Sequence, residues 1–330
     1  MVLAWMCWSW TTWSCGGQRE MDSRTLKAGI PVAISLTLLA YVLRDVDPHG
    51  VLQRLGGIGL APIVAVLALQ VAIIILISLR WRLIIQHTGC ELPLSEAMMV
   101  YVGTAPAEIV LPAKTADLIK ANYLHVHQCL PFAKGVSTIL LDNLFDLAAL
   151  ICILSLGVAL SGEVVPGQAV WVLAGIGTLV AGVAAASRVV DHPVFASFQA
   201  LGPRLIATLF VLALSVWILV VASVTLYFSM ADIDVPTTAV MLYLPLTVVL
   251  AALPITVGGV GSMEWTMRLF YGRFGPVEAI ITAAVLQRLV TTAFPLLVGL
   301  PIISRVIWSD AADPSGARAL SGAYDEEEEG

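Results

Sequence analysis

The sequence predicts an all-α protein that crosses a membrane several times. Of its 330 residues, 59% are hydrophobic and only 12% are charged, whereas soluble domains carry about 25% charged residues. Four long stretches contain no Asp, Glu, Lys or Arg: residues 58–79, 164–187, 205–231 and 235–263. Helices of that length cross the ~30 Å apolar core of a bilayer at ~1.5 Å per residue. Closed β-barrels lack such runs, so the membrane segments are expected to be helices.

Eight apolar runs follow one another along the chain, and six of them are long enough for a full crossing. These six are residues 28–43, 58–79, 133–160, 165–187, 205–230 and 279–304. The other two runs, 97–111 and 237–256, are interrupted by proline and glycine. Because proline removes a backbone donor and glycine weakens a helix, both runs are expected to break at membrane depth. Irregular backbone is tolerated there only where protein or a wet cavity surrounds it.

The order of these segments predicts an inverted repeat. Residues 25–160 and residues 165–304 both read as helix, helix, broken segment, helix. Three full crossings in each half give the halves opposite orientations, so the broken segments would enter from opposite faces and meet near the midplane. A plain helical bundle with proline kinks explains the same hydropathy and stays open as an alternative.

Basic residues next to the apolar runs predict the orientation. Nine of them gather on one side, against Arg44 and Arg54 on the other, which places the N-terminus in the cytoplasm and the protein in the cytoplasmic (inner) membrane. The nine are Arg24, Lys27, Arg80, Arg82, Lys114, Lys120, Lys134, Arg188 and Arg204. The terminal segments are set apart: residues 1–24 contain a second methionine, Met21, which we expect to be the true start. Residues 305–330 end in an acidic run and are expected to be disordered.

Composition also excludes several classes of function. Apart from the acidic residues at 325–329, the chain has 17 basic and 18 acidic residues and no basic, aromatic footprint for nucleic acid. Its five cysteines form no C-x-x-C pair and no ligand spacing with histidine, so no metal or other cofactor is expected. No H-E-x-x-H, G-x-S-x-G or Walker A pattern occurs, which argues against an enzyme.

Charged residues inside the apolar runs are the candidate site residues, because each costs ~2.5–3.5 kcal/mol there unless it meets a partner or a cavity. Asp142 and Asp146 are spaced i, i+4 and therefore share one face of the helix expected at 133–160. They can bind a cationic headgroup or protons, or hold Arg288 of the last helix. A purely structural ion pair is the competing interpretation.

The two broken segments supply the other candidates. Asp117 and Lys120, at i, i+3 after Pro112, suit a zwitterionic or phosphate-bearing headgroup. Glu264 follows a loop whose glycines permit close backbone approach, namely Gly258, Gly259 and Gly261. Glu264 is expected either to face a site or to cap a helix that begins near Ser262.

Two further groups of residues are expected to lie at the membrane boundary. Trp81, between Arg80 and Arg82, is interpreted as an interfacial anchor. His125 and His127 are interpreted as solvated loop residues at the cytoplasmic boundary.

Several of these motifs, taken in order, resemble the membrane region of lysylphosphatidylglycerol synthases and its stand-alone relatives. They are Arg80-Trp81-Arg82, Leu111-Pro112 with Ala116-Asp117 and Lys120, Leu141-Asp142-Asn143-Leu144-Phe145-Asp146, Leu253-Pro254 with Gly258-Gly259-Val260-Gly261 and Glu264, and Arg288. The resemblance covers about residues 25–304 and implies a flippase-like region for an aminoacylated phospholipid. In that family a separate soluble domain transfers the aminoacyl group; after residue 304 we expect no such domain here.

The chain departs from the family pattern at three places. The family usually has Gly before the acid at 117, Arg at position 120, and Glu-Arg where Asp142-Asn143 stand. The missing Arg at 143 removes a bidentate phosphate donor, so the same lipid is not implied.

We therefore expect a flippase-like translocator of a phospholipid or lipid-linked headgroup. Membrane lipids are its expected ligands, and a lipid-synthesising enzyme is a candidate partner. The expected path is lined by Asp117, Lys120, Asp142, Asp146, Gly258, Gly259, Gly261, Glu264 and Arg288. Two alternatives remain: a membrane-embedded lipid transferase, disfavoured by outer loops of only a few residues, and a partner subunit that transports nothing.

Overall fold

A computed structural model describes residues 35–44, 46–110, 116–127, 130–161, 201–251, 256 and 260–307, together with the single positions 177 and 198. Every regular element in these ranges is helical, as the sequence predicts. Four helices are long and apolar enough to cross a membrane: Leu60–His87, Phe132–Ser161, Pro203–Met230 and Val277–Ile302. They match four of the six predicted crossings. The run 165–187 lies outside the described residues except at 177, and the run 28–43 is described, as helix, only from residue 35.

From residue 46 onward, the elements in chain order are α3 (Pro48–Gly57), α4 (Leu60–His87), α5 (Leu94–Val110), α6 (Asp117–His127), α7 (Phe132–Ser161), α9 (Pro203–Met230), α10 (Thr237–Ala251), α11 (Ser262–Tyr271), α12 (Val277–Arg288), the π-helix η3 (Leu289–Ala293) and α13 (Phe294–Ile307). The helix starts follow local chemistry. Asp47 caps α3 by accepting from the backbone N–H groups of His49 and Gly50, and Pro203 occupies the first turn of α9.

Both segments predicted to be broken are divided into two helices. The first is α5 followed by α6, and the second is α10 followed by α11. The interior prolines are not the points of division, because Pro106 lies inside α5 and Pro245 inside α10. The divisions fall between Val110 and Asp117 and between Ala251 and Ser262, the stretches that contain Pro112 and Pro254.

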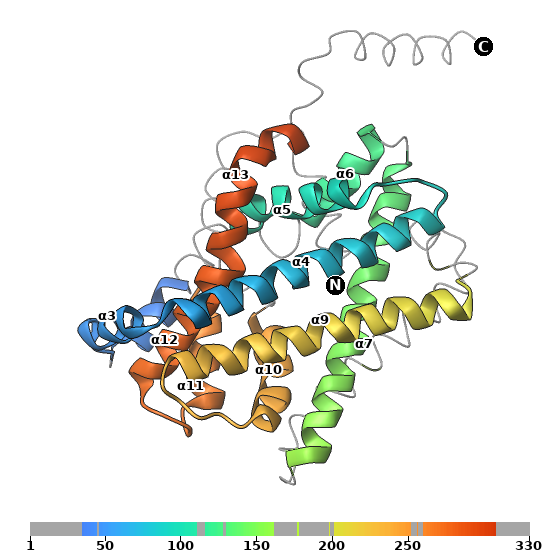
Figure 1. Cartoon of the computed structure of the whole chain (residues 1–330). Helices are drawn as coiled ribbons and strands as arrows, with labels where there is room; N and C mark the ends of the chain where they lie inside the picture. Colours follow the sequence, from blue (N-terminus) through green and yellow to red (C-terminus); the bar gives the residue numbers. More distant parts are fainter. Residues whose placement is uncertain are drawn as a thin grey trace, which may run out of the picture.

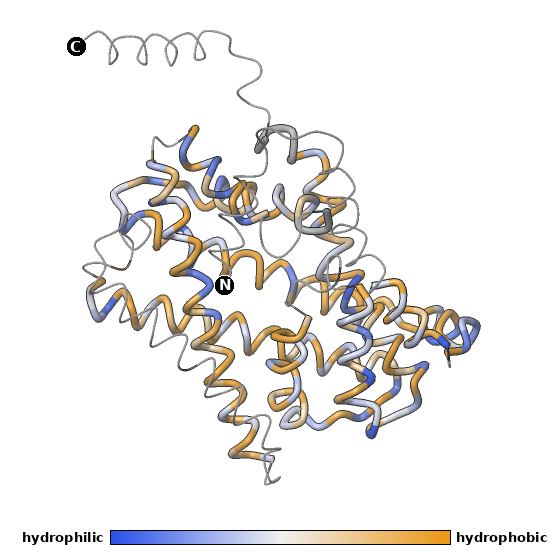
Figure 2. The backbone as a smooth tube through the Cα atoms, turned by 180° about the vertical axis from the view of Figure 1, so that it is seen from behind, coloured by the Kyte–Doolittle hydropathy of each residue, from blue (hydrophilic) through white to orange (hydrophobic). Residues whose placement is uncertain are grey.

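The long helices cross one another in a bundle with the divided segments at opposite ends. α4 and α9 lie side by side and run in opposite directions, while α5 and α6 lie at the upper end of Figure 1 and α10 and α11 at the lower end. α7 packs against α10, and α13 packs against α5. Hydrophobic colour runs along most of the length of the long helices, as Figure 2 shows.

Large apolar side chains also cover the outside of the bundle. Val211 and Ile218 of α9 are 58% and 49% exposed, and Val64 of α4 is 55% exposed. Such a surface is unfavourable in water and suited to lipid, in agreement with the membrane class that the composition predicts.

Candidate functional site

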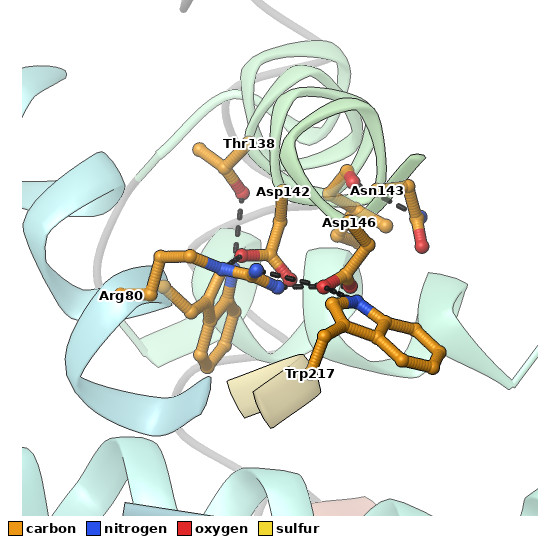
Figure 3. Close-up of polar contacts among 8 residues, drawn as sticks. Arg80, Thr138, Asp142, Asn143, Asp146 and Trp217 are labelled. Atoms are coloured by element: carbon orange, nitrogen blue, oxygen red, sulfur yellow. Dashed lines mark hydrogen bonds and ion pairs between the residues drawn. The ribbon is translucent and has the colours of Figure 1, made fainter. Parts of the chain in front are cut away.

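An ion cluster joins α4 to α7 inside the bundle. The Nε of Arg80 donates to Oδ1 of Asp142 at 2.6 Å, while its Nη1 and Nη2 donate to Oδ1 and Oδ2 of Asp146 at 2.7 and 2.9 Å. Arg80 is completely buried. Figure 3 shows its guanidinium group lying between the two carboxylates. The i, i+4 spacing therefore places both acids on one face, as predicted, and their partner is Arg80 and not Arg288.

Two tryptophans hold this cluster in place. The indole N–H of Trp217 on α9 donates to Oδ1 of Asp146 at 3.1 Å. Trp81, next to Arg80, is only 4% exposed, and its indole N–H donates to Oγ1 of Thr138 on α7 at 3.3 Å. The interpretation of Trp81 and Arg80 as interfacial residues is therefore wrong: both face the interior of the bundle, because the acids on α7 provide partners for Arg80.

With both acids ionised, the cluster carries an excess of negative charge. Arg80 contributes one positive charge, and Asp142 and Asp146 contribute one negative charge each when both are ionised. A net charge among apolar helices is unfavourable unless another charge, a proton or water compensates it. The arrangement is therefore suited to receive one additional positive charge.

A cavity of about 220 Å³ lies beside the cluster, between α4, α5, α7, α9 and the α12–η3 region. Apolar side chains form most of its wall, and polar ones are spread among them. The polar and aromatic lining residues are Gln70, Tyr101, Asp146, Trp217, Ser223, Tyr227, Gln287 and Thr291. Asp146 thus connects the ion cluster to the cavity.

Two lining residues have unused hydrogen-bonding capacity. Tyr227 is 1% exposed and Gln287 is 9% exposed, and neither the hydroxyl of Tyr227 nor Oε1 of Gln287 has a hydrogen-bond partner in the described part of the chain. Leaving a buried polar group unpaired costs about 1–3 kcal/mol. Most buried polar groups are paired, so these two atoms are available to hydrogen-bond a ligand or water in the cavity.

A second ion pair fixes the start of α11. Glu264 accepts from the backbone N–H of Gly261 through Oε2 and from Nε of Arg288 through Oε1, both at 2.8 Å. The helix begins at Ser262, as predicted, and Glu264 caps it. Gly261 has a φ of +86°, and a Cβ there would lie 2.8 Å from the backbone oxygen of Ser35. Glycine is therefore needed for both its conformation and its closeness to the helical residues 35–43.

Replacing Glu264 by Gln is expected to lower the free energy of unfolding by about 2 kcal/mol, because the neutral amide loses the charge and one of two charge-assisted hydrogen bonds. Thermal unfolding in detergent, followed by tryptophan fluorescence, measures the effect. Glu91→Gln, at an exposed position, is the matched control. Equal stability of both variants would contradict the role assigned to Glu264.

A third pair lies on α6. Nζ of Lys120 is 2.7 Å from Oδ1 of Asp117, and the same ammonium lies 4.9 Å from the centre of the Tyr101 ring. Because Tyr101 also lines the cavity, Lys120 stands next to the cavity wall. The i, i+3 pairing is thus present.

The predicted site residues fall into three groups, of which the Asp117–Lys120 pair on α6 is one. Asp142 and Asp146 share one cluster, whereas Glu264 and Arg288 form a separate pair. Gly258 and Gly259 lie outside the described residues. His125 and His127 are exposed, as predicted, but belong to α6 and not to a loop; the ring of His127 stacks on Tyr123.

Sequence reasoning missed the uncharged members of the cavity wall. Gln70, Gln287 and Tyr227 all lie within predicted apolar runs; a glutamine in such a run is a sequence signal for the first two, and Tyr227 has none. In the described residues, no group of three or more His, Cys, Asp or Glu side chains is arranged to hold a metal ion.

Comparison with known proteins identifies the family. Residues 30–299 match the family model described as the lysylphosphatidylglycerol synthase TM region. No protein of curated function matches the chain.

Proposed function

Because the chain belongs to the family of the lysylphosphatidylglycerol synthase TM region, which makes it a multi-pass membrane protein of lipid metabolism, we propose that it is a flippase-like translocator. In this proposal it moves the headgroup of a phospholipid or lipid-linked molecule across the cytoplasmic membrane, with its N-terminus in the cytoplasm. It catalyses no covalent step, and a separate lipid-synthesising enzyme supplies the lipid.

The cavity beside the ion cluster, with polar side chains in a mostly apolar wall, carries the proposal. It lies between helices long enough to cross a membrane, and Asp146 reaches it from a cluster with excess negative charge. A polar headgroup that enters the bundle would find hydrogen-bond partners there, while the acyl chains remain against the apolar outer surface. A structural ion pair alone explains neither the cavity nor its unpaired polar atoms.

The lining favours a headgroup that bears an ammonium group. An ammonium has three donors and no acceptor. Asp146, Gln287 and Tyr227 offer a carboxylate, an amide oxygen and a phenolic oxygen on the same cavity. The ammonium would also neutralise the excess charge of the cluster, and Lys120 beside Tyr101 is placed to attract the accompanying phosphate.

An inverted repeat would give this cavity access from both sides, and four residue pairs support one. The two residues of each pair are 142 positions apart in the sequence. The pairs are Tyr101 and Tyr243, Pro112 and Pro254, Asp146 and Arg288, and Gly157 and Gly299. Repeats of this kind in transporters rock against each other around a central site.

The packing is consistent with that repeat. Gly157 of α7 lies against the backbone of α10, where a Cβ would be 2.7 Å from the nitrogen of Leu242. Gly299 of α13 lies against α5, where a Cβ would be 2.3 Å from the oxygen of Val102. Each half thus inserts a glycine against the first helix of the other half's divided segment, while α4 and α9 run in opposite directions (Figure 1).

Reconstitution of the full chain into vesicles tests the proposal. We expect the protein to speed the movement of a short-chain fluorescent phosphatidylethanolamine between leaflets, measured by albumin extraction, more than that of phosphatidylglycerol, which lacks the ammonium. Asp146→Asn removes the carboxylate at the cavity and should slow the movement about tenfold or more, equivalent to ~1.4 kcal/mol.

Asp232→Asn is the matched control, because this aspartate side chain is 85% exposed and its positive φ suits asparagine. No acceleration of either lipid, at normal expression and stability, would rule out translocation of these headgroups. Equal rates for Asp146→Asn and the wild type would favour the alternative in which the cluster is only structural.

A further inference from the structure

We propose that the Arg80–Asp142–Asp146 cluster holds one exchangeable proton on Asp142, which the positive charge of an entering headgroup displaces, so that headgroup movement is coupled to proton movement in the opposite direction. This inference rests on the proposed function and assigns its energy source. It follows from charge, hydrogen bonding and the cavity together.

The three charged side chains of the cluster do not balance one another. One guanidinium between two carboxylates leaves one negative charge among apolar helices, and Arg80 itself is completely buried. Among the described residues, no group of three or more His, Cys, Asp or Glu side chains is arranged to hold a metal ion there. A proton on either acid makes the cluster neutral without any other ligand.

The two acids differ in the number of hydrogen bonds that they accept. Asp146 accepts three donors, two from Arg80 and one from Trp217, so both of its oxygens already accept hydrogen bonds. Asp142 accepts one donor, Nε of Arg80 through Oδ1, and no hydrogen bond to its Oδ2 occurs in the described part of the chain. The proton is therefore assigned to Asp142, and Asp146 keeps the negative charge that faces the cavity.

The remaining titratable groups around α7 leave this assignment unchanged. On α6, the positive charge of Lys120 attracts the carboxylate of Asp142, but Lys120 is already paired with Asp117. α10 carries no charged residue and one tyrosine, Tyr243, which stacks on Phe270 of α11. α9 presents Tyr227 to the cavity and has Arg204 in its first turn, and α5 contributes Tyr101 to the same wall.

A proton and an ammonium group compete for the one excess negative charge of the cluster. With Asp142 protonated the cluster is neutral and attracts an ammonium weakly. When an ammonium occupies the cavity at Asp146, the proton on Asp142 becomes the excess charge and leaves. Each transfer thus exchanges one ammonium for one proton, and the cluster stays close to neutral in both states. Ammonium binding is expected to weaken as the pH falls.

Vesicles containing the full chain, fluorescent phosphatidylethanolamine and an internal pH dye test the coupling. In the wild type we expect a proton gradient to drive phosphatidylethanolamine in the direction opposite to that of the protons. The internal pH dye should report the proton movement that accompanies it. Asp142→Asn keeps the cluster neutral, as the protonated acid does. It should therefore move the lipid at one slow rate at every pH, with no dye signal, while Asp232→Asn behaves as the wild type.

The outcomes separate this inference from the proposed function. If the wild type moves the lipid at a rate independent of the proton gradient, the coupling is wrong and the proposed flippase function stands. If the rate depends on sodium and not on protons, sodium is the coupled ion and the proton assignment is wrong. If Asp142→Asn retains the pH response, the exchangeable proton is carried by a group other than Asp142. Failure of the wild type to move the lipid under any condition would overturn both proposals. The wild-type dye measurement decides the question even if the variant does not fold.

Discussion

Arg80→Met is expected to lower the free energy of unfolding by about 3–5 kcal/mol, enough to abolish accumulation of the folded protein. The substitution removes the group that donates three hydrogen bonds to Asp142 and Asp146. Two carboxylates would then remain close together on one face of α7 without a counter-charge. Leaving charges buried and unpaired costs far more than the net contribution of an intact ion pair.

Thermal unfolding in detergent and the monodisperse yield after purification measure this loss. Arg82→Met is the matched control, because Arg82 is partly exposed and, within the part of the chain that the structure describes, donates only to the backbone oxygen of Leu92. The triple variant Arg80→Met, Asp142→Asn, Asp146→Asn carries no charge in the cluster. It should regain most of the stability and remain inactive in lipid movement. A stable single variant would contradict the assigned role of Arg80.

Gly157→Ala and Gly299→Ala are each expected to lower the free energy of unfolding by about 1–3 kcal/mol. The added methyl group would lie 2.7 Å from the backbone nitrogen of Leu242 at Gly157, and 2.3 Å from the backbone oxygen of Val102 at Gly299. Backbone cannot rotate away as a side chain can, so α7 must separate from α10, or α13 from α5.

Gly56→Ala, in α3, provides the comparison, since a Cβ there meets nothing within 4 Å. Alanine in a helix is better than glycine, so this variant should be as stable as the wild type or more stable. Unfolding curves of the three variants in the same detergent settle the comparison. If Gly299→Ala matched Gly56→Ala, the close approach of α13 to α5 would be wrong.

The sequence predicted the elements well because hydropathy and proline placement are local signals. α7, α9 and α10 begin within two residues of the predicted runs, and both interrupted runs form two helices. The main error in a described boundary is at the end of α4. It continues to His87, whereas the apolar run stops at residue 79, because Arg80 is neutralised by acids on another helix.

The parts of the site that were not predicted depend on contacts between different helices. The shared face of Asp142 and Asp146 follows from their spacing alone. Their partner does not, because a basic residue at the edge of an apolar run has the same pattern whether it lies at the membrane surface or inside the bundle. Gln287 and Tyr227 carry no charge, and their grouping around one cavity depends on helix packing, which one sequence does not reveal.

In the proposed inverted repeat, Asp146 and Gly157 correspond to Arg288 and Gly299, and the π-helix η3 accounts for the different positions of Asp146 and Arg288. In α7, Asp146 and Gly157 lie eleven positions apart in an uninterrupted α-helix, which places them on one side of the rod. Arg288 and Gly299 have the same separation, but η3 lies between them and turns the second rod by roughly a quarter of a revolution. With Gly299 fixed against α5, Arg288 is thereby directed to Glu264 and not to the cavity. In the proposed repeat, a single register offset thus gives the corresponding residues different places: Asp146 reaches the cavity, and Arg288 pairs with Glu264.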